Sequence, residues 1–141
     1  MTVLLPQAGP VLRAASTPLT AVFWDGCTDK RLLFQRCGTC GAAQFDPALR
    51  CRSCQRDDLR WEDSAGRGIV TTWTVVWRPV VPTYVVPYAP AIVALDEGFS
   101  MVTAIVGCDD ADVRTGLRVA VVFHADEAGF VLPYFEPEAA A

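Results

Sequence analysis

The sequence has one histidine, fewer basic than acidic residues, and no long uninterrupted apolar run. A membrane span needs about 18 unbroken apolar residues, and no segment of the chain approaches that length. The N-terminal segment also lacks a basic cluster ahead of an apolar core, which a secretory signal would need. We therefore expect a cytoplasmic protein that has no membrane partner.

The shortage of basic residues argues against a nucleic-acid partner. The chain carries 12 Lys and Arg against 16 Asp and Glu, which gives a net charge of −4. From residue 64 onward, 4 basic residues stand against 9 acidic ones. Aromatic side chains such as Trp73 and Trp77 could stack on bases, but nucleic-acid binding draws most of its non-specific affinity from a basic surface. A small nucleic-acid-binding module is therefore the alternative and not the preferred function.

The scarcity of histidine also limits the catalytic sites that this chain could form. His124 lies in a segment of alternating residues, opposite the regular apolar row, which predicts an exposed position at a strand end. Cys27 and Cys108 stand apart from any metal-binding pattern, and we interpret them as small, partly buried apolar residues. Neighbouring carboxylates such as Asp96 and Glu97 lie in turn-like sequence. We find no self-sufficient active site.

Four of the six cysteines form two Cys-x-x-Cys pairs, Cys37 with Cys40 and Cys51 with Cys54. In a reducing cytosol such a spaced set indicates a metal site more than a disulfide framework. Zinc binds four thiolates in a tetrahedron, and iron in a rubredoxin-like site is the less favoured alternative. Gly41 follows the first pair and can adopt the left-handed backbone that such a turn demands.

A closed four-thiolate zinc site has no open position for water or substrate, so this zinc would be structural. The segment around it has too few apolar residues for an independent core. Metal binding would then supply free energy of folding directly.

The rest of the chain predicts a mainly β protein in three parts. Residues 1–29 would form a loose leader and a short helix, which starts at Thr17-Pro18 and stops at Gly26. Residues 30–65 would form the zinc ribbon, and residues 66–141 a five-stranded barrel of the OB-fold type. The five predicted strands are IVTTWTVVW, AIVAL, SMVTAIV, LRVAVVF and GFVLPYF, with a tight hairpin at Asp96-Glu97-Gly98 and an irregular proline-rich link before the second strand.

Several motifs together resemble one family over most of the chain. They are FWDG, LLFQRCGTCGAAQFDP, CRSC, WEDSAGRGIVTTWTVVWRP, VPYAPAIVALDEG, GCDDADVRTGLRV and LPYF, in this order between Phe23 and Phe135. They resemble the thiolase-associated, acyl-CoA-associated family of unknown-function domains, built of an N-terminal helix, a rubredoxin-like zinc ribbon and a C-terminal OB-fold. The partner domain of steroid side-chain aldolases is similar to this family.

The resemblance implies a non-catalytic accessory subunit of a thiolase-like acyl-CoA enzyme, either a thiolase or a retro-aldolase of steroid side-chain degradation. The partner would be a thiolase-fold protein in a hetero-oligomer that shares the acyl-CoA substrate. It also implies metal binding at the four cysteines. From their aromatic or basic character we name five residues as candidate partner or acyl-CoA contacts: Phe23, Trp24, Arg78, Tyr84 and Tyr88. Internal packing of the aromatic residues, and simple solvent exposure of Arg78, are the alternatives.

Overall fold

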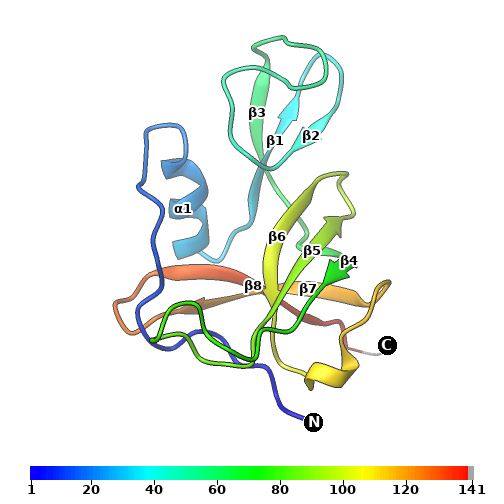
Figure 1. Ribbon diagram of the computed structural model, residues 1–141. Helices are drawn as coiled ribbons and strands as arrows, with labels where there is room; N and C mark the ends of the chain where they lie inside the picture. The colour runs from blue at the N-terminus through cyan, green and yellow to red at the C-terminus, as the bar shows by residue number, and fades with distance from the viewer. Residues whose placement is uncertain (140–141) are drawn as a thin grey trace.

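The computed structural model describes residues 1–139, which form a short helix, a small three-stranded sheet and a five-stranded closed barrel (Figure 1). The elements are α1 (Ala21–Thr28), β1 (Leu33–Cys37), β2 (Ala43–Gln44), β3 (Leu59–Asp63), β4 (Arg67–Trp73), β5 (Ala89–Leu95), β6 (Ser100–Ile105), the 3-10 helix η1 (Asp110–Asp112), β7 (Arg118–Ala125) and β8 (Val131–Pro137). Within the described residues, no helix is long and apolar enough to cross a membrane.

The barrel confirms the predicted OB-fold. Its strands follow the order β4-β5-β6-β8-β7, and β7 pairs back onto β4 to close the sheet. All pairs are antiparallel except β6 with β8, which meet in parallel at Ile105 and Phe135. Alternate residues of β5 point inward, so Val93 is fully buried whereas its neighbour Ile92 is exposed. The predicted hairpin is present, since the Leu95 N–H donates to the Phe99 carbonyl at 2.8 Å.

The first barrel strand is shorter than predicted. β4 ends at Trp73, four residues before Trp77, and residues 74–88 form an irregular loop. Its one ladder contact is an isolated bridge between Val76 and Tyr88. The loop contains Pro79, Pro82 and Pro87, which lack the N–H that a ladder requires, so no regular strand forms over that stretch.

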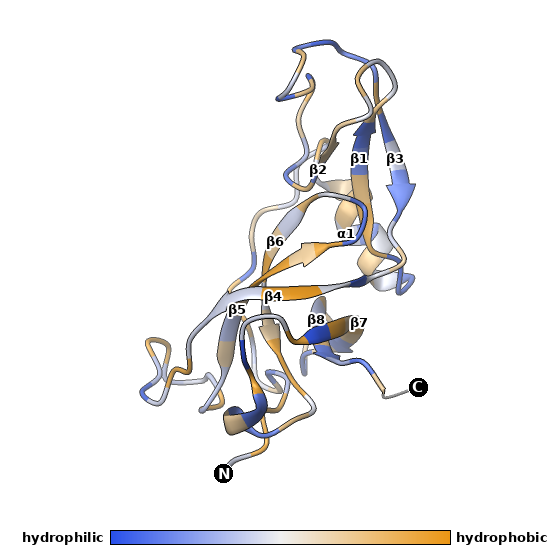
Figure 2. Ribbon diagram, turned by 90° about the vertical axis from the view of Figure 1, so that its right-hand side faces the viewer, coloured by the Kyte–Doolittle hydropathy of each residue, from blue (hydrophilic) through white to orange (hydrophobic). Residues whose placement is uncertain are grey.

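The ribbon sheet has the order β2-β1-β3 and projects from one end of the barrel (Figure 1). Its third strand is largely hydrophilic, whereas β5 of the barrel is largely hydrophobic (Figure 2). At its base the ribbon is joined to the barrel by stacked aromatic rings: the Phe34 and Phe99 centroids are 4.7 Å apart, and those of Phe45 and Phe99 are 5.9 Å apart. Phe23 of α1 contacts Phe45 edge-on at 5.2 Å. Helix, ribbon and barrel therefore share one hydrophobic core.

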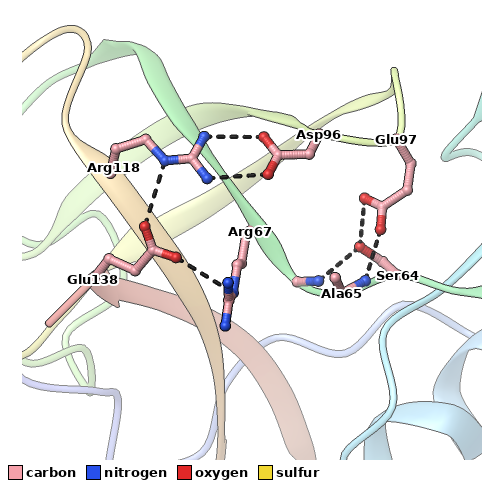
Figure 3. Close-up of polar contacts among 8 residues, drawn as sticks. Ser64, Ala65, Arg67, Asp96, Glu97, Arg118 and Glu138 are labelled. Atoms are coloured by element: carbon pink, nitrogen blue, oxygen red, sulfur yellow. Dashed lines mark hydrogen bonds and ion pairs between the residues drawn. The ribbon is translucent and has the colours of Figure 1, made fainter. Parts of the chain in front are cut away.

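Polar contacts reinforce the connection from β3 to β4, where the predicted boundary at residues 65 and 66 falls (Figure 3). The Glu97 carboxylate accepts hydrogen bonds from the Ser64 hydroxyl at 2.8 Å and from the Ala65 N–H at 2.7 Å. Beside it, Arg118 donates to both carboxylate oxygens of Asp96 at 3.0 Å. These bonds tie the start of β4 to the β5–β6 hairpin and to β7.

Glu138 extends this network at the far end of β8. Its carboxylate lies 3.4 Å from the Arg118 guanidinium and 3.3 Å from that of Arg67 (Figure 3). All of these charged groups are partly exposed, so water and salt screen the pairs, and we assign them an orienting role more than a large stabilising one.

Besides the length of the first barrel strand, three sequence predictions are wrong. The N-terminal residues are not loose, because Leu4 is fully buried and its N–H donates to the Cys108 carbonyl at 2.8 Å. His124 is half-buried against the Tyr134 ring, at 5.6 Å between centroids, and not exposed.

The third error concerns the helix, which starts at Ala21 and runs through Gly26. The residues before it form a turn that leads directly into α1. Thr17 and Thr20 bond each other reciprocally from N–H to hydroxyl oxygen, at 2.9 and 3.2 Å, and the Ala21 N–H donates to the Thr17 carbonyl at 2.8 Å. Gly26 is needed for close packing, because a Cβ there would lie 2.8 Å from the Leu33 side chain.

Candidate metal centre and neighbouring cavity

The structure brings the four predicted cysteines of the ribbon together. Their sulfur atoms all lie within 4.8 Å of one another. Cys37 and Cys54 are 3.6 Å apart at sulfur, and so are Cys40 and Cys51. A disulfide would need about 2.05 Å, so these are free thiols and not two bridges.

The sulfur atoms have the spacing that a tetrahedral zinc ion needs. With a Zn–S bond of about 2.3 Å, the edges of a regular tetrahedron of sulfurs are about 3.8 Å long. The observed contacts of 3.6 Å are close to that value. The residues therefore fit a four-thiolate metal site, and such a set fills the coordination shell of zinc.

Each pair of cysteines lies in a turn with the same hydrogen bonds. In the first turn the Gly41 N–H donates to the Cys37 carbonyl at 2.9 Å, and in the second the Gln55 N–H donates to the Cys51 carbonyl at 2.8 Å. Both turns need a left-handed residue: Gly41 has φ 77° and Gln55 has φ 66°. Gln55 adopts this conformation despite its Cβ, which usually costs about 1–2 kcal/mol.

Backbone N–H groups point at the sulfur of the first cysteine in each turn. The Cys40 N–H donates to Cys37 at 3.5 Å and the Ser53 N–H donates to Cys51 at 3.3 Å. Such bonds lower the pKa of the Cys37 thiol, and the bond from the Cys40 N–H has the largest effect. Bonds from the Cys54 and Ser53 N–H groups lower the pKa of Cys51 to about 6.

The second cysteine of each pair behaves in the opposite way. The N–H of Arg56 favours the thiolate of Cys54, but burial and the three neighbouring thiols raise the pKa of Cys54 to about 12. The pKa of Cys40 is also raised: its bond from the Ala42 N–H is outweighed by the Cys51 thiol and burial. Four adjacent thiolates repel one another, so a bound cation is what would allow all of them to ionise together.

A cavity of about 490 Å³ lies beside the ribbon, within the size range of small-molecule pockets. It is lined by the N-terminal segment, α1, the loop after β2, the loop before β5, and strands β6 and β8. Four of the five predicted contact residues line it together: Phe23, Trp24, Tyr84 and Tyr88. Phe23 is also part of the buried core, so it packs internally as well, while Arg78 is exposed and outside the cavity.

Part of the cavity wall could not be predicted from the sequence. Gln7 and Leu12 of the N-terminal segment line it, as do Thr103 of β6 and Tyr134 of β8. The N-terminal residues carry no periodic pattern that would have marked them. The sequence predicts Tyr134 only as a strand residue. Its hydroxyl accepts a hydrogen bond from the Gln7 N–H at 3.2 Å, and Gln7 is 127 positions away in the chain.

Among the described residues, none of those that line the cavity is a serine, cysteine or histidine, and the hydroxyl–carboxylate pair of Ser64 and Glu97 lies outside the lining. His124 makes no side-chain hydrogen bond within residues 1–139, and its neighbour is the Tyr134 ring. Cys27 is fully buried, and its desolvation raises the pKa of the thiol to about 12. Burial, followed by Asp112 and Asp109, raises the pKa of Cys108 as well. These two cysteines are therefore poor nucleophiles.

Comparison with known proteins gives a consistent result for both parts of the chain. Residues 24–60 match the family model of the ChsH2 rubredoxin-like zinc ribbon domain, and residues 61–124 match that of the ChsH2 C-terminal OB-fold domain. A solved structure described as the Ltp2-ChsH2(DUF35) aldolase superposes with a TM-score of 0.81 at 30% identity, covering 89% of this chain and 98% of that one.

Two relatives show the range of proteins that contain such a unit. The chain is 31% identical over 128 residues to the 3-oxo-4,17-pregnadiene-20-carboxyl-CoA hydratase alpha subunit of Mycobacterium tuberculosis, covering 91% of this chain and 40% of the relative. It is 34% identical over 94 residues to a DUF35 domain-containing scaffold protein of Methanocaldococcus jannaschii, covering 65% of this chain and 67% of the relative. The chain spans less than half the length of the hydratase subunits that it matches. It belongs to the DUF35 family, in the form of a ChsH2-type zinc ribbon followed by an OB-fold.

Proposed function

We propose that this chain is a non-catalytic accessory subunit of an enzyme that acts on acyl-CoA thioesters. The observation that carries the proposal is the combination of a four-thiolate site with no open position and an apolar cavity whose described lining residues include no serine, cysteine or histidine. Relatives named as a hydratase alpha subunit, as part of an aldolase and as a scaffold protein support such a role.

The partner that we propose is a thiolase-fold protein in a hetero-oligomer, with retro-aldol cleavage or thiolysis as its reaction and a steroid side chain as one class of acyl group. In that assembly the partner supplies the acid and base groups. This chain supports the complex and guides the acyl-CoA thioester between sites.

The metal that we propose for the ribbon is structural zinc. The zinc ribbon match and the arrangement of the four cysteines support it. Zinc bound there would hold the two turns together and supply free energy of folding, because the ribbon beyond its aromatic base has little apolar core.

Charge pairing argues against the nucleic-acid alternative. The ribbon has most of the arginines, but Arg31 pairs with Asp63 at 2.7 Å and Arg36 with Glu62 at 2.9 Å. Arg60 also lies 3.7 Å from an Asp58 oxygen. These pairs neutralise three of the six arginines of the ribbon and so reduce the positive charge that phosphate groups need for binding.

A pull-down from the native host tests the proposed function. An affinity-tagged chain is captured at moderate salt, and the retained proteins are identified by mass spectrometry, with a Cys51→Ser chain as matched control. We expect a thiolase-fold protein to be retained by the native sequence and lost with the control. Salt-sensitive retention of single-stranded DNA without such a protein would contradict the proposal.

A further inference from the structure

Residues 7–15, here called the strap, run across the outside of the barrel towards α1 and form one wall of the cavity (Figure 1). The strap is held by a reciprocal pair of bonds at its start. The Gln7 side-chain amide donates to the Val85 carbonyl at 3.0 Å, and its oxygen accepts from the Val85 N–H at 2.7 Å. The Gln7 side chain thus satisfies both backbone groups of Val85, as a neighbouring strand would, and fixes the strap to the irregular loop before β5.

A second anchor lies further along the strap, at the buried carboxylate of Asp126. The Val11 N–H donates to this carboxylate at 3.3 Å, and the Arg13 guanidinium lies 3.8 Å from it. The same guanidinium covers the Phe130 ring at 4.5 Å. Since the anchoring groups belong to the strap and the barrel alone, the cavity wall exists before any ligand is bound, as is usual for small-molecule sites.

The cavity lining carries almost no charge. Asp46 is the one charged lining residue among the described residues, and an Arg52 nitrogen lies 3.5 Å from its carboxylate. Among the described residues no Lys or Arg lines the cavity, so a phosphate or a free carboxylate would lose its hydration there without gaining a counter-charge. The lining instead offers apolar surface, including Leu12, whose exposed fraction of 74% leaves it open to solvent on the strap.

Two hydroxyl groups give this apolar site a means of orienting a ligand. The Tyr84 hydroxyl accepts from the Leu12 N–H at 3.1 Å, and the Tyr134 hydroxyl accepts from the Gln7 N–H at 3.2 Å. Neither hydroxyl donates to another group within residues 1–139. Each O–H therefore remains able to donate to a neutral acceptor such as a carbonyl oxygen.

We propose that the strap cavity binds an uncharged, apolar small molecule. Resting on the function proposed above, we further infer that the occupant is the acyl portion of the CoA thioester, while the charged nucleotide end stays outside. The apolar lining, the missing positive charge and the free hydroxyl donors select this portion. A protein side chain from a partner is the competing occupant, and the experiment below separates the two.

Binding of the neutral fluorophore N-phenyl-1-naphthylamine to the full chain tests the inference. We expect saturable binding, displacement by dodecanoyl-CoA, and no displacement by CoA at the same concentration. Two variants fill the cavity, Ala15→Phe on the strap and Ala104→Phe on β6. Each should weaken binding at least tenfold. The matched control is Ala8→Phe, on an exposed strap position outside the lining, and it should leave binding unchanged.

Circular dichroism and metal content establish that each variant is folded, and having two filling variants keeps the test decisive if one does not fold. The inference is overturned if the native chain shows no saturable binding, if CoA displaces the fluorophore as well as dodecanoyl-CoA does, or if a folded filling variant binds like Ala8→Phe. A thiolase-fold protein captured by a chain that fails to bind the fluorophore would leave the proposed function standing and assign the cavity to the partner. Fluorophore binding by a chain that captures no thiolase-fold protein would support the cavity's ligand and contradict the proposed function.

Discussion

The Phe34 ring of the ribbon stacks on the Phe99 ring of the barrel, with centroids 4.7 Å apart and planes inclined by 22°. Phe99 comes from the tip of the β5–β6 hairpin, and both rings are buried. Phe45, close to the second strand of the ribbon, lies almost parallel to Phe99 at 7°. One barrel residue thus holds two segments of the ribbon.

We predict that Phe99→Ala lowers the free energy of unfolding by about 3–5 kcal/mol, because it leaves a cavity between the two stacked rings. Phe99→Leu is the matched control and should cost clearly less, since it fills part of the space. Urea unfolding followed by circular dichroism measures both. A loss below about 1 kcal/mol for Phe99→Ala would show that the ribbon is held to the barrel by other contacts.

We predict that Cys51→Ser removes the metal and unfolds the ribbon turns. Cys51 is fully buried and supplies one of four thiolates, so its loss leaves an incomplete coordination shell. Elemental analysis should find about one zinc per native chain and almost none in the variant. Cys108→Ser, which alters a half-buried cysteine outside the site, should keep the zinc. Correctly folded native protein without zinc or iron would refute the metal assignment.

We predict that Gln55→Gly stabilises the second turn by up to about 1 kcal/mol. Glycine removes the backbone strain of the left-handed conformation, which costs about 1–2 kcal/mol at Gln55. Glycine also gives the unfolded chain more conformational freedom, which offsets about 0.5–1 kcal/mol of that gain. The reverse change in the matching turn, Gly41→Gln, should destabilise the protein. Thermal unfolding at fixed zinc concentration compares them. A less stable Gln55→Gly variant would mean that the 3.4 Å bond from the Gln55 side chain to the Arg52 carbonyl outweighs the backbone cost.

Asp126 gives a prediction on pH. Hydrogen bonds from the N–H groups of Phe130, Val11 and Ala128, with the Arg13 charge, lower the pKa of Asp126 despite its burial. A carboxyl whose pKa is lower in the folded state stabilises the fold above its unfolded value of about 3.9, and that contribution is lost as the pH falls through the folded value.

The stability difference between the native chain and Asp126→Asn should therefore be constant above about pH 5 and shrink below about pH 4. Acid also releases the metal from both proteins, so the difference between them is the quantity to follow by urea unfolding. A difference that stays constant or grows as the pH falls to about 3 would contradict the role assigned to this carboxylate.

The gathering of the four cysteines and the barrel could be predicted because their signals are local. The spacing of Cys37, Cys40, Cys51 and Cys54 along the chain limits the geometries that the turns can adopt, and the barrel strands show their alternating pattern within a few residues. Gly41 was correctly expected to be left-handed.

The strap and the cavity could not be predicted because they depend on contacts between distant residues. Gln7 meets Val85 across 78 positions, and Val11 meets Asp126 across 115. Glutamine has no periodic or compositional signature that marks it as a partner for a loop. The helix start was misplaced by only a few residues: the Thr17 hydroxyl accepts from the Thr20 N–H as an N-cap would, but the regular helix begins at Ala21.

The central claim is that this chain works only together with a catalytic partner. Turnover of an acyl-CoA thioester by the purified chain, by the captured thiolase-fold protein, and by the two together tests it most directly. We predict no turnover by the chain alone and full activity for the complex. Turnover by the chain alone, at a rate that survives repurification, would contradict it.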